Sequence, residues 1–205
     1  MSKKSDFFAK KKFLPLSGIL TQDLCQVVTR YAISKEFNEF RADTQVPNSH
    51  AMVFDDLFES ILHSLIHPME KSTGLELCPT YSFCRVYRPG MELKRHVDRE
   101  SCEVSITICF GYSYDAQKYQ WPIKIIDGET KQEVAVSQSP GDGLIYRGCD
   151  LEHWRDKLDV NDNNYHVQAF FHFVDKFGPH FPKHAYEGRD RKKVKKIDRL
   201  LRGNP

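Results

Sequence analysis

Two side chains that commonly bind metal ions, His96 and Asp98, stand one residue apart in the run "YRPGMELKRHVDRESCEVSITICF", residues 87–110. The residues that follow them alternate as in a β-strand. Side chains at positions i and i+2 of extended backbone point the same way, so this pair can hold one ion while Val97 faces elsewhere. An H-x-D pair alone is a weak signal in a chain with nine histidines.

A third ligand is offered by the run "PGDGLIYRGCDLEHWRDKL", residues 140–158, where a glycine-rich turn leads into a strand that ends at His153. Two neighbouring ligands and a distant histidine match the two-histidine, one-carboxylate arrangement. Such a set binds Fe(II) on one face and leaves positions open for a co-substrate and O₂. The sequence therefore predicts a metal centre made of His96, Asp98 and His153.

Other polar residues have simpler interpretations. His63 and His67 are spaced i, i+4 on a predicted helix, but Ser64 follows the first histidine where a zinc protease motif needs glutamate. A partly exposed helix face explains them better. Three charged residues after the H-x-D pair could meet a substrate or form ion pairs that fix the loop: Arg99, Glu100 and Glu103.

Helical periodicity precedes these motifs. Thr21 is a suitable N-cap for a helix over 22–40 with apolar residues at helical spacing. A second apolar stripe runs through 54–73, with Gly74 as its stop and Pro68 as the point where a kink is expected. These two helices should form the N-terminal part of the fold.

From residue 80 the period changes to the alternation of β-strands. The expected strands cover 81–88, 103–110, 122–126, 132–137, 143–147, 151–155 and 166–174. Short strands broken by Gly, Pro and Asp predict a jelly roll or a sandwich. Beyond them a charged helix is expected over 190–202.

Length and composition indicate one ordinary globular domain. The 205 residues are 40% hydrophobic and 28% charged, and no apolar stretch is long enough to span a membrane. We expect a cytoplasmic protein with a basic segment over 1–15, one domain over 16–175 (helical to 79, jelly roll from 80) and a basic tail over 176–205. The six cysteines form no C-x-x-C pair and are expected to be reduced thiols.

Charge is concentrated at the two ends. Residues 1–12 carry +4, and residues 183–202 carry nine Lys or Arg against three acidic residues, so the rest of the chain is acidic. Basic ends suit an acidic macromolecule such as nucleic acid. Lysine-rich termini are, however, most often solvated.

The run from Tyr81 to Asp175 resembles the Fe(II)- and 2-oxoglutarate-dependent dioxygenases, in particular their prolyl 4-hydroxylase-like branch. "YRPGMELKRHVD" is similar to the family's aromatic-Pro-Gly entry to H-x-D, and "SITICF" to the strand that follows. "WPIKI" and "PGDGLIYRG" resemble the middle strands, and "HVQAFFHFVD" the last one. The order of these pieces is more specific than any one of them.

The resemblance implies a mainly β, α+β fold: a double-stranded β-helix (jelly roll) core with N-terminal helices packed on it. It implies Fe(II), 2-oxoglutarate and O₂ as cofactor and co-substrates, with His96, Asp98 and His153 as iron ligands. It further implies that 2-oxoglutarate is decarboxylated to succinate while a substrate is oxidised. Related halogenases replace the aspartate with a small residue so that chloride can bind, so Asp98 favours hydroxylation or another oxidation.

The contacts to 2-oxoglutarate depart from the family pattern. Its C5 carboxylate is usually held by an Arg or Lys that opens the last strand, where this chain has Tyr165 and His166. Arg155, two residues past His153 and able to bind a carboxylate through two parallel hydrogen bonds, is the first alternative, and His166 the second. Four more residues either line the co-substrate pocket or only pack in the barrel: Tyr87, Ser105, Thr107 and Cys109.

The sequence thus predicts a 2-oxoglutarate-dependent dioxygenase, a hydroxylase, of unidentified substrate: a small molecule, a protein residue or, through the basic tail, nucleic acid. The alternative is a non-catalytic jelly-roll binding module with a vestigial or structural metal site, which the missing anchor cation favours and the intact triad opposes. A cupin dioxygenase that needs no 2-oxoglutarate ranks lower, because cupins usually show H-x-H where this chain has H-x-D. Fold and metal ligands fix the oxidant and not its target.

Overall fold

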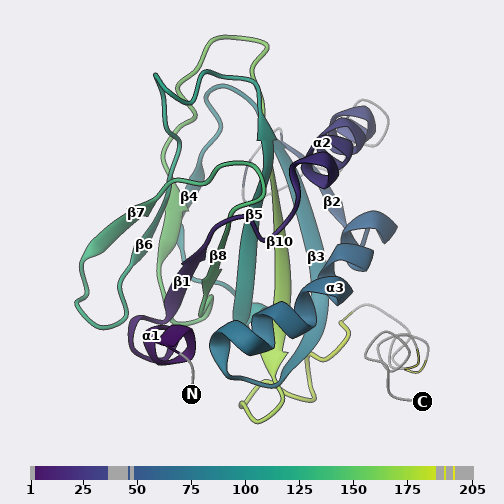
Figure 1. Cartoon of the computed structure of the whole chain (residues 1–205), viewed down its shortest axis with the longest axis vertical. Coiled ribbons are helices and arrows are strands. Elements are labelled where there is room, and N and C mark those ends of the chain that lie inside the picture. The colour runs from purple at the N-terminus through teal and green to yellow at the C-terminus, as the bar shows by residue number, and fades with distance from the viewer. Residues whose placement is uncertain (1–2, 37–45, 47–48, 188–191, 193–195, 197–205) are drawn as a thin grey trace.

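Two antiparallel sheets packed face to face form the body of the protein in the computed structural model (Figure 1). The structure describes residues 3–36, 46, 49–187, 192 and 196. The larger sheet has six strands in the order β1-β8-β5-β10-β3-β2. Their bounds are Phe13–Leu16 (β1), His50–Val53 (β2), Leu77–Tyr87 (β3), Val104–Tyr112 (β5), Gly143–Tyr146 (β8) and His166–Asp175 (β10).

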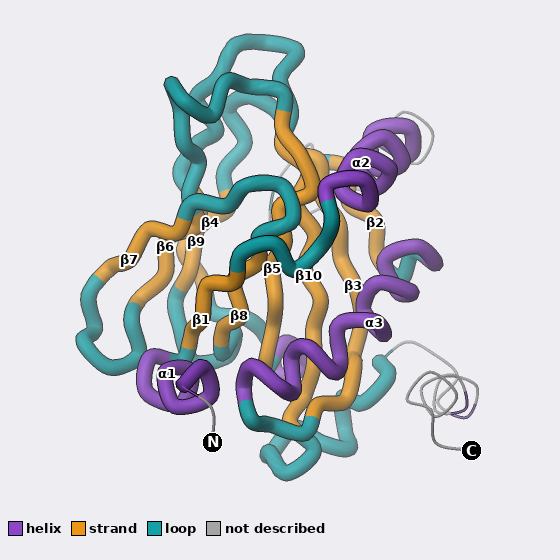
Figure 2. The backbone as a smooth tube through the Cα atoms, in the orientation of Figure 1, coloured by secondary structure: helices purple, strands orange, loops and turns teal. Residues whose placement is uncertain are grey.

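The smaller sheet has the order β4-β9-β6-β7 and faces the inner side of the larger one. Its strands are Leu93–His96 (β4), Ile123–Ile126 (β6), Glu133–Val136 (β7) and His153–Arg155 (β9). Loops 113–122 and 156–165 extend beyond the strands at one end of the sandwich (Figure 2). The two sheets together make the jelly roll that the sequence predicts.

Alternation along β5 explains why its two faces differ. Val104, Ile106, Ile108 and Phe110 belong to a buried apolar cluster that they share with the helices. The intervening residues, including Ser105, face the smaller sheet. The larger sheet therefore has an apolar outer face and a more polar inner face.

Helices cover the outer face of the larger sheet (Figure 1). They are α1 (Lys3–Lys11), α2 (Gln22–Glu36) and α3 (Asp56–Thr73), with a short 3₁₀ turn at Glu100–Cys102. The Asp55 side chain caps α3 by accepting a hydrogen bond from the Leu57 N–H, and Gly74 ends it with a φ of 76°. The helix continues through Pro68 and ends at Gly74, so the stop predicted at Gly74 is confirmed.

Several elements differ from the predicted ones. The basic N-terminal segment folds into α1 and β1, and neither β2 nor β4 is among the predicted strands. β3 begins at Leu77, before Pro79, because the register between β3 and β10 shifts at that position and accommodates the proline. The end of the first predicted helix (37–40) and most of the predicted C-terminal helix (190–202) lie outside the described residues.

Two further expectations can be compared with the structure. All six cysteines are free thiols. None of the helices in the described part of the chain is both long and apolar enough to cross a membrane.

Candidate metal centre

The three predicted ligands meet at one point between the sheets. His96 is the last residue of β4, His153 is the first of β9, and the two residues pair across these antiparallel strands. Asp98 lies two residues beyond β4, where its backbone N–H donates to the Gly148 carbonyl at 2.9 Å. Strand pairing and this loop contact together bring Asp98 and His153, which are 55 positions apart in the sequence, into one cluster with His96.

The donor atoms of the triad are oriented for a metal. The Nε2 atoms of His96 and His153 lie 3.4 and 3.5 Å from Oδ1 of Asp98. Two ligand atoms that each lie about 2.1 Å from one metal are separated by roughly 3 to 3.5 Å at angles between octahedral and tetrahedral. The spacing is therefore that of ligands around an ion rather than that of direct hydrogen bonds.

Backbone carbonyls fix the tautomer of both histidines. Nδ1 of His96 donates to the Lys94 carbonyl at 2.7 Å, and Nδ1 of His153 donates to the Leu151 carbonyl at 2.9 Å. Because Nδ1 carries the proton, Nε2 of each neutral ring presents its lone pair to the centre. Outer partners of this kind orient metal-binding imidazoles in known sites.

The electrostatics keep the carboxylate ionised. Burial raises the pKa of Asp98, but the neighbouring imidazoles of His153 and His96 outweigh it and hold that pKa well below its usual range. Burial lowers the pKa of His96, while the nearby Asp98 carboxylate and the hydrogen bond to the Lys94 carbonyl raise it above its usual value. The site thus carries a fixed negative charge, which favours a cation.

One oxygen of Asp98 supports the fit of a metal. Oδ2 is buried and accepts no hydrogen bond from any residue in the described part of the chain. Such an atom loses its hydration without compensation unless an ion or water meets it. A Cβ atom built on Gly148 would lie 2.4 Å from this oxygen, so only glycine leaves room for the carboxylate here.

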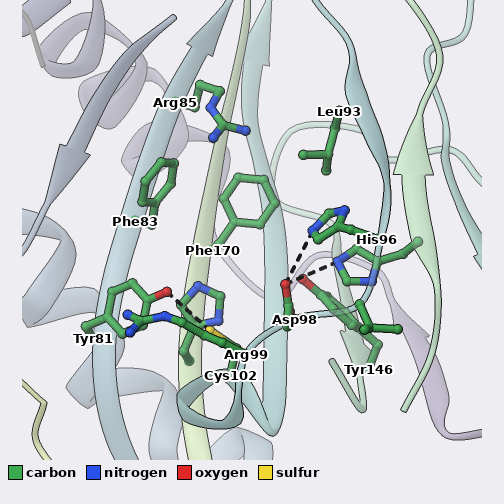
Figure 3. A pocket seen from close by; sticks show the side chains of 13 residues that line it. Tyr81, Phe83, Arg85, Leu93, His96, Asp98, Arg99, Cys102, Tyr146 and Phe170 are labelled. Carbon is green, nitrogen blue, oxygen red and sulfur yellow. Dashed lines mark hydrogen bonds and ion pairs between the residues drawn. The ribbon is translucent and has the colours of Figure 1, made fainter. Parts of the chain in front are cut away.

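A cavity of about 260 Å³ extends from the triad between the sheets (Figure 3). Its wall is largely aromatic and apolar, with two cationic side chains, Arg85 and Arg99. The lining residues besides the triad are Tyr81, Phe83, Arg85, Leu93, Val97, Arg99, Cys102, Tyr146, Phe170 and His172. Its size and its mixed lining suit a small ligand next to the metal.

Sequence reasoning missed two neighbours of the triad, Cys102 and His172. Their donor atoms and a carboxylate oxygen of Asp98 all lie within 4.8 Å of one another. Burial lowers the pKa of His172 to about 4 and raises the pKa of Cys102 to about 12, so both are neutral at pH 7. The alternation of polar residues along the last strand was the available signal for His172.

The guanidinium of Arg155, the first predicted anchor for 2-oxoglutarate, has partners inside the protein. It is 1% exposed, lies over the ring of Trp121, and donates to the Trp121 carbonyl at 2.6 Å and to Oε1 of Gln138 at 2.9 Å. Arg155 follows His153 on β9 as expected, but it is not among the described residues that line the cavity.

His166, the second predicted anchor, is also fully engaged. Its Nε2–H donates to Oε1 of Gln168 at 2.8 Å, and Nδ1 accepts from the Tyr114 hydroxyl at 2.9 Å. Burial, and then the nearby charge of Arg155, lower the pKa of His166 to about 3. A histidine that is neutral at pH 7 lacks the charge that an anchor for a carboxylate needs.

The other predicted contacts are buried in the barrel. Thr107 accepts a hydrogen bond from Gln168, and burial raises the pKa of Cys109 to about 12. The Tyr87 hydroxyl accepts a hydrogen bond from Nη1 of Arg85 at 2.8 Å. None of Tyr87, Thr107 and Cys109 is among the described residues that line the cavity, so their contact with a co-substrate stays a prediction.

The charged residues after the triad form ion pairs. Arg99 pairs with Glu187 at 2.8 Å and lies over the ring of Tyr81. Glu100 pairs with Lys183 at 2.8 Å, and Glu103 with Arg147 at 2.9 Å. Of these residues only Arg99 lines the cavity and can meet a ligand at its rim.

The helical histidines lie apart from the site. His63 and His67 belong to α3 on the outer face of the larger sheet, and neither belongs to a possible metal-binding cluster of the described residues. The interpretation of this pair as part of a partly exposed helix face therefore agrees with their position.

Solved structures share this architecture. A prolyl-4-hydroxylase from Pseudomonas putida superposes with a TM-score of 0.65 at 13% identity, covering 83% of this chain and 96% of that one. The two chains therefore share the jelly-roll fold. The α-ketoglutarate-dependent carbocyclase SnoK from nogalamycin biosynthesis superposes with a TM-score of 0.67 at 12% identity, covering 95% and 90% of the two chains.

A third structure contains ligands. HygX from Streptomyces hygroscopicus, with nickel, 2-oxoglutarate and hygromycin B bound, superposes with a TM-score of 0.65 at 12% identity and covers 95% of this chain and 99% of that one. Comparison of the sequence with protein-family models found no match, and comparison with curated proteins found none either. The resemblance noted in the sequence is therefore supported at the level of the fold.

Proposed function

We propose that this protein is an Fe(II)- and 2-oxoglutarate-dependent dioxygenase, with His96, Asp98 and His153 as its iron ligands. The observation that carries the proposal is the convergence of both histidine Nε2 atoms on Oδ1 of Asp98 at one end of a jelly-roll cavity. When bound, iron and 2-oxoglutarate would supply an oxidant from O₂ and release succinate and CO₂.

The residues of the chain have distinct roles in this proposal. Asp98 supplies the ionised ligand, and the Lys94 and Leu151 carbonyls hold His96 and His153 in the neutral tautomer that can bind a metal. Aromatic side chains such as Phe170 line the cavity and limit the access of water to the centre. Because Asp98 occupies the third ligand position, hydroxylation of the substrate is the favoured outcome.

The proposed substrate is a small molecule or a residue of another protein. Among the similar structures, one is a prolyl-4-hydroxylase and another contains hygromycin B. A vestigial metal site is less consistent with this chain, because Oδ2 of Asp98 is buried and accepts no hydrogen bond from the described residues, which is unfavourable in a site that never holds a cation. The cytoplasmic location stays a prediction.

Formation of succinate tests the proposal. The full chain would be incubated in air with Fe(II) and 2-oxoglutarate but no further substrate, and succinate measured over time. We expect slow succinate formation that Asp98→Ala abolishes and His67→Ala, a change outside the site, leaves unaltered. Succinate at the level of Asp98→Ala in the parent protein, across added peptide and small-molecule substrates, would favour the binding-module alternative.

A further inference from the structure

Arg85 is a buried cation in the wall of the triad cavity. It lies on β3 and is 1% exposed, whereas the side chain of Arg99, the other cation of the wall, is 57% exposed and pairs with Glu187. In Figure 3 Arg85 lies beyond the ring of Phe170 as seen from Asp98. The cavity thus has the metal ligands at one end and a guanidinium at another.

The alternation of β3 directs Arg85 inward. Tyr81, Phe83, Arg85 and Tyr87 share the inner face of this strand, and the first three line the cavity. The guanidinium carbon lies 4.8 Å from the centre of the Phe83 ring and 5.2 Å from that of Tyr87, and Nη1 donates to the Tyr87 hydroxyl at 2.8 Å. These contacts hold the planar group in one orientation before a ligand arrives.

The strand also sets the distance between charge and metal. The Tyr81 hydroxyl is 3.2 Å from Sγ of Cys102, a neighbour of Asp98, so Tyr81 marks the level of the triad. Arg85 is four residues further along β3, about 13 Å at the usual strand rise. Arg85 lines the cavity, and a five-carbon diacid bound at the metal would extend into the same space, so the ligand and the arginine side chain together can span this separation.

We propose that Arg85 binds the carboxylate of 2-oxoglutarate that is remote from the metal, and that it makes the site selective for a diacid. The proposal rests on the proposed function, because the other end of the ligand needs the metal. It places the anchor on β3 rather than at the start of the last strand, where the chain has a neutral histidine. Arg155 is the weaker candidate because its two bound nitrogens face Trp121 and Gln138, outside the cavity lining.

A guanidinium can bind a carboxylate through two parallel charged hydrogen bonds. Its loss should weaken binding of 2-oxoglutarate at least about tenfold, because each such bond contributes about 1.5 to 3 kcal/mol. A monocarboxylic analogue, 2-oxobutyrate, lacks the remote carboxylate and should be insensitive to the change. The selectivity for a diacid over a monoacid therefore separates an anchor from a residue that only supports the fold.

The test measures the dissociation constants of 2-oxoglutarate and of 2-oxobutyrate by calorimetry on the full chain loaded with Mn(II). The proteins compared are the parent, Arg85→Met, Arg85→Lys and Arg155→Met. Mn(II) affinity is measured first for each protein, so that loss of metal cannot mimic loss of the anchor. We expect Arg85→Met to lose the preference for 2-oxoglutarate, Arg85→Lys to recover part of it, and Arg155→Met to keep it. Arg95→Met, a change at an exposed arginine, is the matched control.

Two results would overturn the assignment of Arg85 and leave the proposed function intact. One is an unchanged preference for 2-oxoglutarate over 2-oxobutyrate in both Arg85 variants. The other is a preference that is lost in Arg155→Met and retained in Arg85→Met. If the Mn(II)-loaded parent protein binds no 2-oxoglutarate, the proposed function itself is wrong. Should Arg85→Met fail to fold, Arg85→Lys decides, because a shorter and non-planar cation must still reduce the preference if the paired contact exists.

Discussion

Replacing Gly148 with alanine should weaken metal binding through the Asp98 carboxylate. The added Cβ would lie 2.4 Å from Oδ2 of Asp98 and 2.4 Å from the Cys102 carbonyl oxygen, both far inside contact distance. The backbone at Gly148 cannot simply move away, because its carbonyl accepts from the Asp98 N–H and its own N–H donates to the Glu103 carbonyl at 3.1 Å. The carboxylate must therefore shift from the position that faces both histidines.

Two magnitudes follow from this geometry. Overpacking of a buried site typically costs about 1 to 3 kcal/mol of folding stability. Changes in the groups that position a metal ligand typically lower metal affinity by about 10- to 100-fold. Gly148→Ala should show both effects, with the larger consequence at the metal because the clash falls on a ligand atom.

The assay combines Mn(II) titration, followed by electron paramagnetic resonance of the free ion, with urea unfolding. Gly18→Ala is the matched control: Gly18 has a φ of 60°, and an added Cβ would meet no atom within 4 Å. This control should lose about 1 kcal/mol from backbone strain alone and keep the parent affinity for Mn(II). A folded Gly148→Ala protein with the parent affinity would refute the assignment of Asp98 as a ligand that needs this space.

Two further predictions concern stability. The pKa of His166 is lowered to about 3 in the folded protein. Below about pH 6.5 the unfolded chain therefore binds a proton at this histidine that the folded chain does not bind. The free energy of unfolding should decrease as the pH falls, by up to about 1.4 kcal/mol per pH unit. Urea unfolding from pH 7 to 5 should give a flatter profile for His166→Gln than for the parent or for the exposed-site control His67→Gln; equal slopes would contradict a neutral buried imidazole. Phe58 is fully buried and packs edge-on against Phe110 at 6.0 Å, so Phe58→Ala should cost about 3 to 5 kcal/mol in the same assay. Val27→Ala, at a residue that is 61% exposed, should stay within about 0.5 kcal/mol, and a similar loss in both variants would count against the packing of α3 on the sheet.

Some elements of the fold could be predicted because their local sequence pattern determines their structure. Alternation located β5 and β10, and the stop at Gly74 follows from the left-handed conformation that ends α3. The metal centre could be predicted because the H-x-D pair and a distant histidine together match a known ligand set, and the structure brings the three residues together through the pairing of β4 and β9. For the strands and the helix stop, a short stretch of sequence determines the structure.

Other features depend on pairing between distant segments. β1 has a proline among its four residues and exists because it pairs with β8, more than a hundred residues later. The choice between Arg85 and Arg155 depends on which inner-face side chain meets the cavity once the two sheets pack. Spacing places Arg155 on the face of His153, but only the structure shows its guanidinium over Trp121.

The assignment of His96, Asp98 and His153 as metal ligands is best tested by equilibrium Mn(II) binding to the parent protein and to an alanine variant of each residue. We expect one bound ion per chain, a loss of affinity of at least about tenfold in each of the three variants, and the parent affinity in a control with both His63 and His67 replaced by alanine. Binding to the parent should weaken as pH falls through the histidine range, because protonated imidazole cannot be a ligand. Parent affinity in Asp98→Ala, or loss of the ion in the His63 and His67 control, would show that the metal does not bind at the proposed triad.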